Sequence, residues 1–235
     1  MSPNQTDVLL LAGGLGTRLR PVLADRQKII APVLGIPFIF YLLNYLSDQG
    51  FRRVVLLVGY QAHLVHSIVG NRYQRLQIDY SVEEQPLGTG GAVLHALSLI
   101  KSPTALILNG DSFCVADYSK LIHLDRACML VTSVSNISRF GSVDVSQNKL
   151  VSSFNEKRDC NQPGLINAGV YSIPTVFLHM LPRGKSSLER DFLPQLAAKQ
   201  LLHAVYGGRF IDIGTPRSYH EAQRFFSGEY DDVAV

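Results

Sequence analysis

The sequence predicts an α/β fold in which helices cover both faces of a mixed, mainly parallel central sheet. Short apolar runs that end in glycine or polar residues, typical of buried parallel strands, recur through the first 111 residues. Segments with apolar residues at helical spacing alternate with them, and the connections are compact. Alternation of this kind indicates a parallel sheet whose helices pack on its two faces.

The first half of the chain supplies the parallel strands and their helices. Apolar or alternating runs predict strands at 7–13, 53–60, 76–84 and 104–111. Helical spacing predicts helices at 37–50, 61–70 and 89–100. Gly50 provides a C-terminal stop for the first of these helices.

The order of elements loosens after about residue 130. Strands are expected at 128–134 and 164–173, with a hairpin over 141–154 that turns at Gln147 and Asn148. A helix at 186–199 would begin with a capping box of Ser186 and Glu189, and Pro194 would kink or divide it. Thr215 and Pro216 are a favourable N-cap and first-turn pair for a last helix.

Length and composition are those of a globular protein. A chain of 235 residues with 46% hydrophobic and 17% charged residues is expected to form one domain. It has no long apolar run or leader-like segment, so we expect a cytoplasmic protein. A net charge of +3 without a basic stripe disfavours nucleic-acid binding. Three widely spaced cysteines, Cys114, Cys128 and Cys160, indicate free thiols.

The stretch "LLAGGLGTRLRP" (10–21) carries the first functional signal. A glycine-rich turn after a strand presents backbone N–H groups to a phosphate. Thr17 and Arg18 follow Gly16 where a Walker-type loop would have lysine and then serine or threonine, and Leu19 occupies the third glycine position of the dinucleotide fingerprint. A tight turn without a ligand is the alternative, although it gives no reason for the cations Arg18 and Lys28 nearby.

Several blocks together resemble the sugar-1-phosphate nucleotidyltransferases, which have a Rossmann-like fold called the nucleotide-diphospho-sugar transferase fold. Lys28 in "QKIIAPVLGIPFI" keeps the family's lysine, whereas Gln27 and Ile36 replace its usual proline and second lysine. The resemblance continues in family order over nearly the whole chain, through "EEQPLGTGGAV" (83–93), "LNGDS" (108–112), "FNEK" (154–157), "INAGVY" (166–171) and "FIDIGTP" (210–216).

The resemblance implies a division of labour along one domain, 1–235. The nucleotide-binding part would span about 1–130 and the sugar-binding part about 131–226, followed by a tail, 227–235. The implied catalytic residues are Arg18, Lys28 and Asp111, and Asp111 and Asp212 would hold Mg²⁺. The implied nucleotide-binding residues are Leu11, Ala12, Gly13, Gly14, Gly16, Thr17, Glu83, Pro86, Gly88 and Thr89. The implied sugar-phosphate-binding residues are Gly141, Glu156, Lys157, Asn167 and Gly169.

Glu83 indicates the nucleobase. Guanine has two adjacent donors, N1–H and the 2-amino group, which one carboxylate can accept together, whereas an amide suits uracil or thymine better. The sequence therefore favours GTP, with Glu84 or Gln85 as alternative readers and an unliganded surface glutamate as the other interpretation.

The predicted substrates are GTP and a sugar 1-phosphate. Within the family the chain is most similar to short guanylyltransferases that act on a heptose 1-phosphate. A mannose-1-phosphate guanylyltransferase, a short uridylyl- or thymidylyltransferase and a catalytically silent nucleotide-sugar sensor are the alternatives. Aromatic residues near the C-terminus leave a homodimer open.

Overall fold

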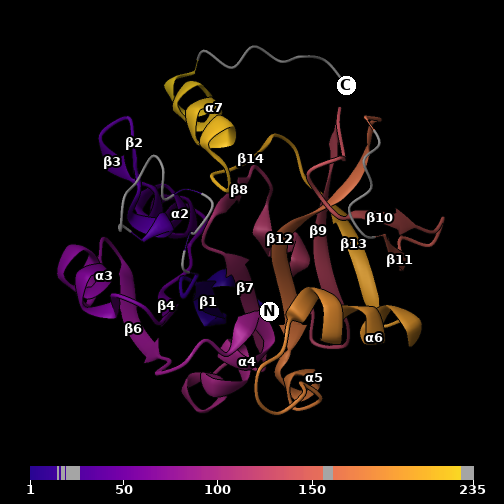
Figure 1. Ribbon diagram of the computed structural model, residues 1–235. Coiled ribbons are helices and arrows are strands. Elements are labelled where there is room, and N and C mark those ends of the chain that lie inside the picture. Colours follow the sequence, from indigo (N-terminus) through magenta and orange to yellow (C-terminus); the bar gives the residue numbers. More distant parts are fainter. Residues whose placement is uncertain (15, 17–18, 20–26, 156–160, 229–235) are drawn as a thin grey trace.

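A ten-stranded mixed sheet forms the centre of the molecule in the computed structural model (Figure 1). The structure describes residues 1–14, 16, 19, 27–155 and 161–228. Four mutually parallel strands lie in the spatial order β7-β1-β4-β6 and make up its core. They are β1 (Asp7–Leu11), β4 (Arg53–Val58), β6 (Leu76–Val82) and β7 (Thr104–Asn109), and the two-residue β5 (Arg72–Tyr73) pairs with the outer edge of β6.

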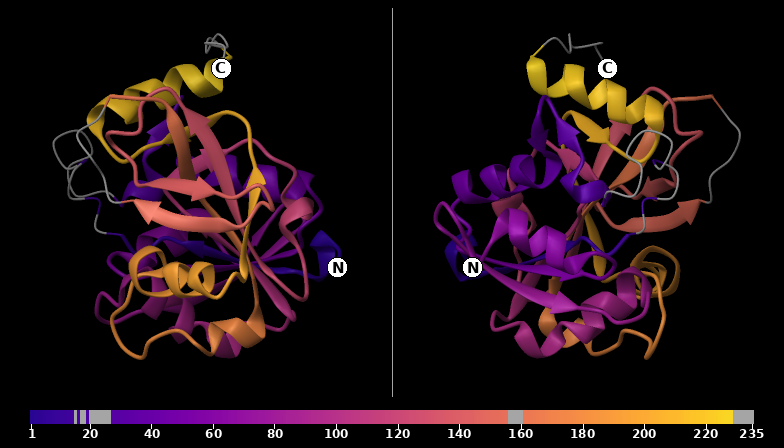
Figure 2. Two further views of the ribbon diagram at one scale, coloured as in Figure 1. Left: turned by 90° about the vertical axis from the view of Figure 1, so that its right-hand side faces the viewer. Right: turned by 60° about the vertical axis from the view of Figure 1, so that its left-hand side comes forward.

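The long strand β12 (Gly164–Pro174) changes the direction of the sheet, because it pairs antiparallel with both β7 and β9. Beyond it lie β9 (Ala127–Val134), β10 (Ser142–Val145), β11 (Val151–Asn155) and β13 (Leu202–Tyr206). The predicted hairpin over 141–154 is confirmed as the β10–β11 pair, which lies at the right-hand side of Figure 1 and faces the viewer in Figure 2 (left). The sequence analysis did not predict β13, which pairs parallel with β9.

Alternate residues of the central strands belong to two separate apolar cores. Val8 and Leu10 of β1 pack with α2 (Phe38–Asp48), α3 (Ala62–Val69) and α7 (Pro216–Ser227). Leu9 belongs to the opposite core, with α4 (Gly88–His95), α5 (Thr175–Leu178) and α6 (Leu193–Ala198). This alternation follows from the two-residue period of a strand, and it confirms the predicted helices on both faces.

Short elements complete the chain. Two small antiparallel pairs join β2 (Pro32–Val33) to β3 (Ile36–Pro37) and β8 (Ser112–Cys114) to β14 (Phe210–Asp212). The 3₁₀ turns are η1 (Pro3–Gln5), η3 (Lys28–Ile30), η4 (Leu97–Leu99) and η5 (Tyr118–Leu121), and η6 (Leu188–Phe192) is a π-helical turn. None of the helices in the described ranges has the length and apolarity needed to span a membrane.

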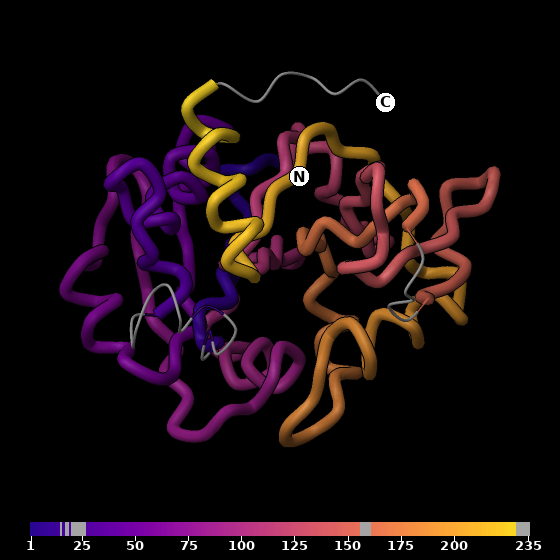
Figure 3. The backbone as a smooth tube through the Cα atoms, turned by 45° about the horizontal axis from the view of Figure 1, so that its top comes forward, coloured from indigo at the N-terminus to yellow at the C-terminus, as the bar shows by residue number. Residues whose placement is uncertain are grey.

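The helix α7 carries the C-terminal part of the chain back onto the N-terminal half. Its Tyr219 hydroxyl donates to the carbonyl oxygen of Pro32, and the Leu34 amide donates to Gln223 at 2.6 Å. Figure 3 shows α7 (yellow) crossing over to the indigo and purple segments. Thr215 caps this helix as predicted, with Ser218 completing a capping box.

The predicted capping box at 186–199 is wrong by one residue. Ser187, not Ser186, accepts the backbone N–H of Arg190, and the buried Ser186 instead packs against α4, where its carbonyl oxygen accepts the Gly90 amide at 2.9 Å. The segment divides at Leu193 into η6 and α6, as expected for a proline at position 194, which has no backbone N–H to donate. Cys114 and Cys128 are free and buried, as predicted.

Candidate active site

Two cavities meet at the carboxyl ends of the parallel strands. The first, of about 440 Å³, lies beside β1 and α4, and the second, of about 390 Å³, lies beside β12 and β14. Asn109 at the end of β7 and Asp111 just beyond it line both cavities. The predicted nucleotide-binding residues that line the first cavity are Leu11, Ala12, Gly13, Gly14, Gly16, Glu83, Pro86, Gly88 and Thr89.

The glycine loop follows β1 and forms one wall of the first cavity. A Cβ atom at Gly13 would lie 2.7 Å from Glu83 Oε1, so a larger residue there would displace the carboxylate from its present position. Gly16 has a φ of +59°, which favours glycine, and it packs against Lys28. The loop therefore brings its backbone close to the carboxylate and to the lysine. Thr17 and Arg18 lie outside the described residues.

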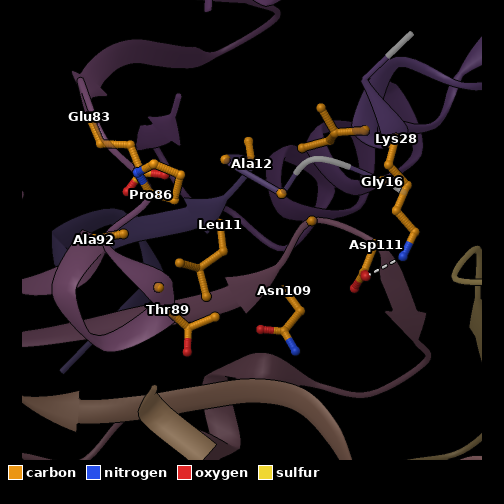
Figure 4. A pocket seen from close by; sticks show the side chains of 15 residues that line it. Leu11, Ala12, Gly16, Lys28, Glu83, Pro86, Thr89, Ala92, Asn109 and Asp111 are labelled. Carbon is orange, nitrogen blue, oxygen red and sulfur yellow. Dashed lines mark hydrogen bonds and ion pairs between the residues drawn. The ribbon is translucent and has the colours of Figure 1, made fainter. Parts of the chain in front are cut away.

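Glu83 and Pro86 lie at one end of the first cavity (Figure 4). Glu83 follows β6, and its Oε2 accepts the Leu87 amide at 3.1 Å. Burial raises the pKa of its carboxyl group, and the hydrogen bond from Leu87 opposes that rise. Its Oε1 lies against Gly13 and Gly59, where a Cβ atom at Gly59 would come within 2.9 Å.

Lys28 and Asp111 lie at the other end of the cavity and form an ion pair of 2.5 Å (Figure 4). The side chain of Lys28 is 12% exposed, whereas that of Asp111 is 44% exposed. Lys28 comes from η3, and Asp111 follows the buried strand β7 through Gly110. Since the predicted catalytic lysine and aspartate are in direct contact, the structure brings this pair together as the sequence predicted.

Asp212 lies at the same point because β14 pairs with β8. Its backbone is opposite Ser112, and the Ile213 amide donates to the Asp111 carbonyl oxygen at 2.8 Å. A Cβ atom at Gly214 would lie 2.6 Å from Asp212 Oδ1 and 3.4 Å from Lys28 Nζ. The two predicted metal ligands and the lysine therefore converge.

Sequence reasoning missed Arg139, which forms an ion pair with Asp212 at 2.9 Å and lines the second cavity. The Gly214 amide and the Ser218 hydroxyl also donate to Asp212, at 2.7 and 3.0 Å. These three donors fix the carboxylate in place. Arg139 lies two positions before Gly141, one of the predicted sugar-phosphate-binding residues, and this position was the only signal available.

Two side-chain oxygens from Asp111 and Asp212 suit a magnesium ion. Mg²⁺ is usually bound through one or two carboxylates, with substrate phosphates and water completing its coordination. Over residues 1–14, 16, 19, 27–155 and 161–228 there is no group of three or more His, Cys, Asp or Glu side chains that would hold a metal without such substrate oxygens. The donor set therefore fits Mg²⁺ bound together with a phosphorylated ligand.

Gly88 and Thr89 begin α4 on the floor of the first cavity. Gly88 has a φ of +74°, and a Cβ atom there would meet the Ser186 carbonyl oxygen. The Thr89 hydroxyl donates to Glu189 Oε2 at 2.8 Å and accepts the Leu188 amide at 2.8 Å. The single proton of this hydroxyl is thus used within the protein.

A bulge in β12 shapes the second cavity, because the strand's register with β9 shifts between Asn167 and Tyr171. The Gly169 amide donates to Asn167 Oδ1 at 2.9 Å. Gly169 has a φ of +75°, and a Cβ atom there would lie 2.7 Å from Asn109 Nδ2. Asn167 and Gly169 line this cavity as the sequence predicted.

The remaining predicted sugar-phosphate-binding residues are Gly141, Glu156 and Lys157. Phe140, rather than its neighbour Gly141, lines the second cavity in the described part of the chain. Glu156 and Lys157 lie outside the described residues. Asn109, which joins the two cavities, was quoted in the "LNGDS" block but was not given a role.

Comparison with known proteins agrees with this geometry. The family model described as "Nucleotidyl transferase" matches residues 7–229. The D-glycero-α-D-manno-heptose 1-phosphate guanylyltransferase of Campylobacter jejuni is 36% identical over 215 residues, which cover 90% of this chain and 96% of that protein. The protein of the same name from Aneurinibacillus thermoaerophilus is 34% identical over 225 residues, covering 93% and 97%.

A solved structure is similar to this protein over nearly the whole chain. The crystal structure of HddC from Yersinia pseudotuberculosis superposes with a TM-score of 0.84 at 36% identity, covering 94% of this chain and 99% of that one. The same protein complexed with GMP-PN gives a TM-score of 0.83. Since the family model spans nearly the whole chain and two relatives exceed 30% identity over almost their full lengths, the chain belongs to the nucleotidyl transferase family.

Proposed function

We propose that this protein transfers a guanylyl group from GTP to D-glycero-α-D-manno-heptose 1-phosphate, giving GDP-heptose and pyrophosphate. One observation carries the proposal: Glu83 lies at one end of a nucleotide-sized cavity, and the Lys28–Asp111 pair lies at its other end, next to the second cavity. The names of the Campylobacter and Aneurinibacillus relatives support both the guanine and the heptose.

The base end of the cavity favours guanine. The Glu83 carboxylate accepts one backbone amide and has further lone pairs for the guanine N1–H and 2-amino group. Uracil and thymine present an acceptor opposite such a carboxylate, which leaves two acceptors facing each other. A base that leaves a buried polar group unpaired costs about 1–3 kcal/mol, enough for a clear preference.

The phosphate end favours displacement at the α-phosphorus. A phosphate oxygen of the sugar 1-phosphate attacks this atom, the new P–O bond forms, and the bond to the β-phosphate oxygen breaks to release pyrophosphate. Because the attacking phosphate is already ionised, no general base is needed. Catalysis then depends on alignment and on neutralising negative charge, for which the glycine-loop amides and Lys28 are placed.

Asp111 and Asp212 would hold Mg²⁺, which supplies positive charge to the reacting phosphates. The residues of the chain do the rest. Arg139 and Ser218 fix the orientation of the Asp212 carboxylate. The Ile213 amide donates to the Asp111 carbonyl oxygen, so the two aspartates are held next to each other along the chain. On the sugar side, Asn167 and Asn109 present amide groups to the second cavity, where sugar hydroxyls would bind.

The test is a substrate matrix. Purified protein with Mg²⁺ is given GTP, UTP, dTTP, ATP or CTP together with heptose, mannose or glucose 1-phosphate, and products are detected by mass spectrometry. We expect GDP-heptose as the main product and loss of turnover on adding EDTA. A preference for UTP or dTTP would refute the guanine assignment, and a preference for mannose 1-phosphate would refute the heptose.

Asp111→Asn tests the metal assignment. It should lose most of the turnover while the melting temperature stays near that of the wild type, because the Asp111 side chain is 44% exposed and lines the cavity. Asp125→Asn is the matched control, since Asp125 is 71% exposed and pairs only with its neighbour Arg126 among the described residues. Near-normal activity of Asp111→Asn would remove this aspartate from the mechanism.

A further inference from the structure

A chain of hydrogen bonds connects the two cavities through Glu189. On one side, the Thr89 hydroxyl, at the floor of the first cavity, donates to Glu189 Oε2 at 2.8 Å. On the other side, the Tyr171 hydroxyl approaches Glu189 Oε1 at 3.5 Å and accepts Asn167 Nδ2 at 2.7 Å. Asn167 lines the second cavity. Glu189 lines neither cavity, yet it joins a residue of each.

The directions of these bonds are fixed by their neighbours. The Glu189 carboxylate can only accept, so the Thr89 and Tyr171 hydroxyls donate their protons to it while they accept the Leu188 amide and Asn167 Nδ2. Both protons go to Glu189, at its two different oxygens. A third hydroxyl, of Ser187, donates to Oε2 at 2.9 Å. A carboxylate satisfies all three donors, because it is the only side chain that accepts at both of its terminal atoms.

This arrangement determines how Asn167 faces the second cavity. Tyr171 is fully buried in the core, so its hydroxyl cannot follow a different Asn167 orientation. With Nδ2 directed to Tyr171 and Oδ1 to the Gly169 amide, the amide plane of Asn167 is held at both ends. Its remaining N–H and lone pair are then presented to a ligand in one orientation. The first turn of α4 is held through Thr89 by the same carboxylate.

We propose that Glu189 is a positioning residue that sets the sugar-side amide of Asn167 through Tyr171 and the nucleotide-side turn through Thr89, so that the two substrate sites are coupled. The proposal rests on the proposed function in one respect only: it takes the first cavity as the nucleotide site and the second as the sugar 1-phosphate site. It requires no particular base or sugar.

The test separates the two arms of this connection. Tyr171→Phe keeps the ring in its buried place and removes only the hydroxyl, so it should raise KM for the sugar 1-phosphate about 3- to 10-fold and leave KM for the nucleotide unchanged. Thr89→Val should raise KM for the nucleotide and leave KM for the sugar 1-phosphate unchanged. Glu189→Gln should raise both KM values, because the single amide oxygen cannot accept donors from two sides. Matched controls are Glu221→Gln and Tyr206→Phe, which lie outside the connection.

Each outcome decides between coupling and simple stabilisation. If Glu189→Gln lowers the melting temperature while both KM values remain unchanged, or if Tyr171→Phe raises the KM values for the nucleotide and the sugar 1-phosphate equally, Glu189 is only structural and the proposal is overturned. Non-additive KM changes in the Tyr171→Phe, Glu189→Gln double variant support it. The measurement uses whichever substrate pair the wild type turns over, so a different base or sugar refutes the proposed function without affecting the coupling. Absence of turnover with every pair refutes both.

Discussion

Replacement of Glu83 by glutamine tests the base-reading end of the cavity. The carboxylate lies against Gly13 and Gly59 and accepts the Leu87 amide, so a glutamine of nearly the same size keeps the packing and changes only the hydrogen-bonding pattern. Its amide oxygen can accept one guanine donor. Its NH₂ group then faces the other donor, and neither of these two N–H groups finds an acceptor.

The expected loss follows from that mismatch. An unpaired polar group in a buried site costs about 1–3 kcal/mol, and each 1.4 kcal/mol is a factor of ten, so kcat/KM for GTP should fall about 5- to 150-fold. The same amide suits the edge of uracil or thymine, so kcat/KM for UTP or dTTP should remain or rise. The ratio of GTP to UTP turnover is therefore the sensitive quantity.

The assay is pyrophosphate release with GTP, UTP and dTTP at a fixed sugar 1-phosphate concentration. Glu84→Gln is the matched control, because the adjacent side chain is exposed and does not line the cavity. An unchanged GTP-to-UTP ratio in Glu83→Gln would refute the assignment, and a changed ratio in Glu84→Gln would transfer it to the neighbouring residue.

The pH dependence provides an independent test of Glu83. Guanine recognition requires the ionised carboxylate, and burial raises the pKa of this group above the ordinary value for glutamate. Protonation therefore begins at a higher pH than in a solvent-exposed glutamate. KM for GTP should rise as the pH falls through this raised value, and the rise should be absent in Glu83→Gln. A GTP KM with the same pH profile in both proteins would contradict the interpretation.

Three further predictions concern the framework of the site. Gly169→Ala should lower both the melting temperature and the affinity for the sugar 1-phosphate, since the new Cβ would lie 2.7 Å from Asn109 Nδ2 at a φ of +75°. Thermal melting and the KM for the sugar 1-phosphate are the measurements. A normal KM would show that the bulge tolerates a side chain. Asp7→Asn should cost about 1–3 kcal/mol in denaturant unfolding, because it removes one of the two carboxylates that pair with the largely buried Arg53 and leaves only Asp79. Burial raises the pKa of Asp7, but hydrogen bonds from Arg53 and two backbone amides outweigh it and lower the pKa overall. The stabilisation from the ion pair is therefore present above about pH 4 and is lost as the pH falls further. A loss of less than about 1 kcal/mol in Asp7→Asn would contradict the argument from a buried ion pair. Burial raises the pKa of the Cys114 thiol to about 12, so it should resist iodoacetamide in the native protein at pH 8, as mass spectrometry of the alkylated protein would show.

Local patterns in the sequence predicted most of the sheet. The buried strands at 53–60 and 104–111 are recognisable because apolar runs of that length between polar residues are typical of buried strands. Strand ends were less accurate. The run from residue 7 was expected to continue to Gly13, but β1 ends at Leu11, because the backbone beyond it turns toward the cavity. Propensity alone does not locate that turn.

Features that depend on distant contacts were not predicted. Four of the five residues of β13 are apolar, but a run this short does not indicate a strand by itself, and the segment becomes one by pairing with β9, about 75 positions earlier in the chain. The exchange of Ser187 for Ser186 as the helix cap has the same origin. Only Ser186 has a glutamate three positions later, so the local pattern favours it, but its backbone is bonded to Leu87 and Gly90, and Ser187 caps the helix instead.

The second predicted metal ligand shows the limit of inference from motifs. Asp212 could be identified because the block "FIDIGTP" resembles the family's, but the resemblance said nothing about what holds the carboxylate. The structure shows that Arg139 does so, from a bend before β10 that is 73 residues away. A carboxylate this little exposed needs a cation or several donors to pair its oxygens, and sequence spacing does not reveal which cation the fold brings to it. Arg139→Ala should therefore weaken Mn²⁺ binding, followed by paramagnetic resonance, through the lost orientation of Asp212. A strengthened Mn²⁺ affinity would show instead that Arg139 competes with the metal for this carboxylate.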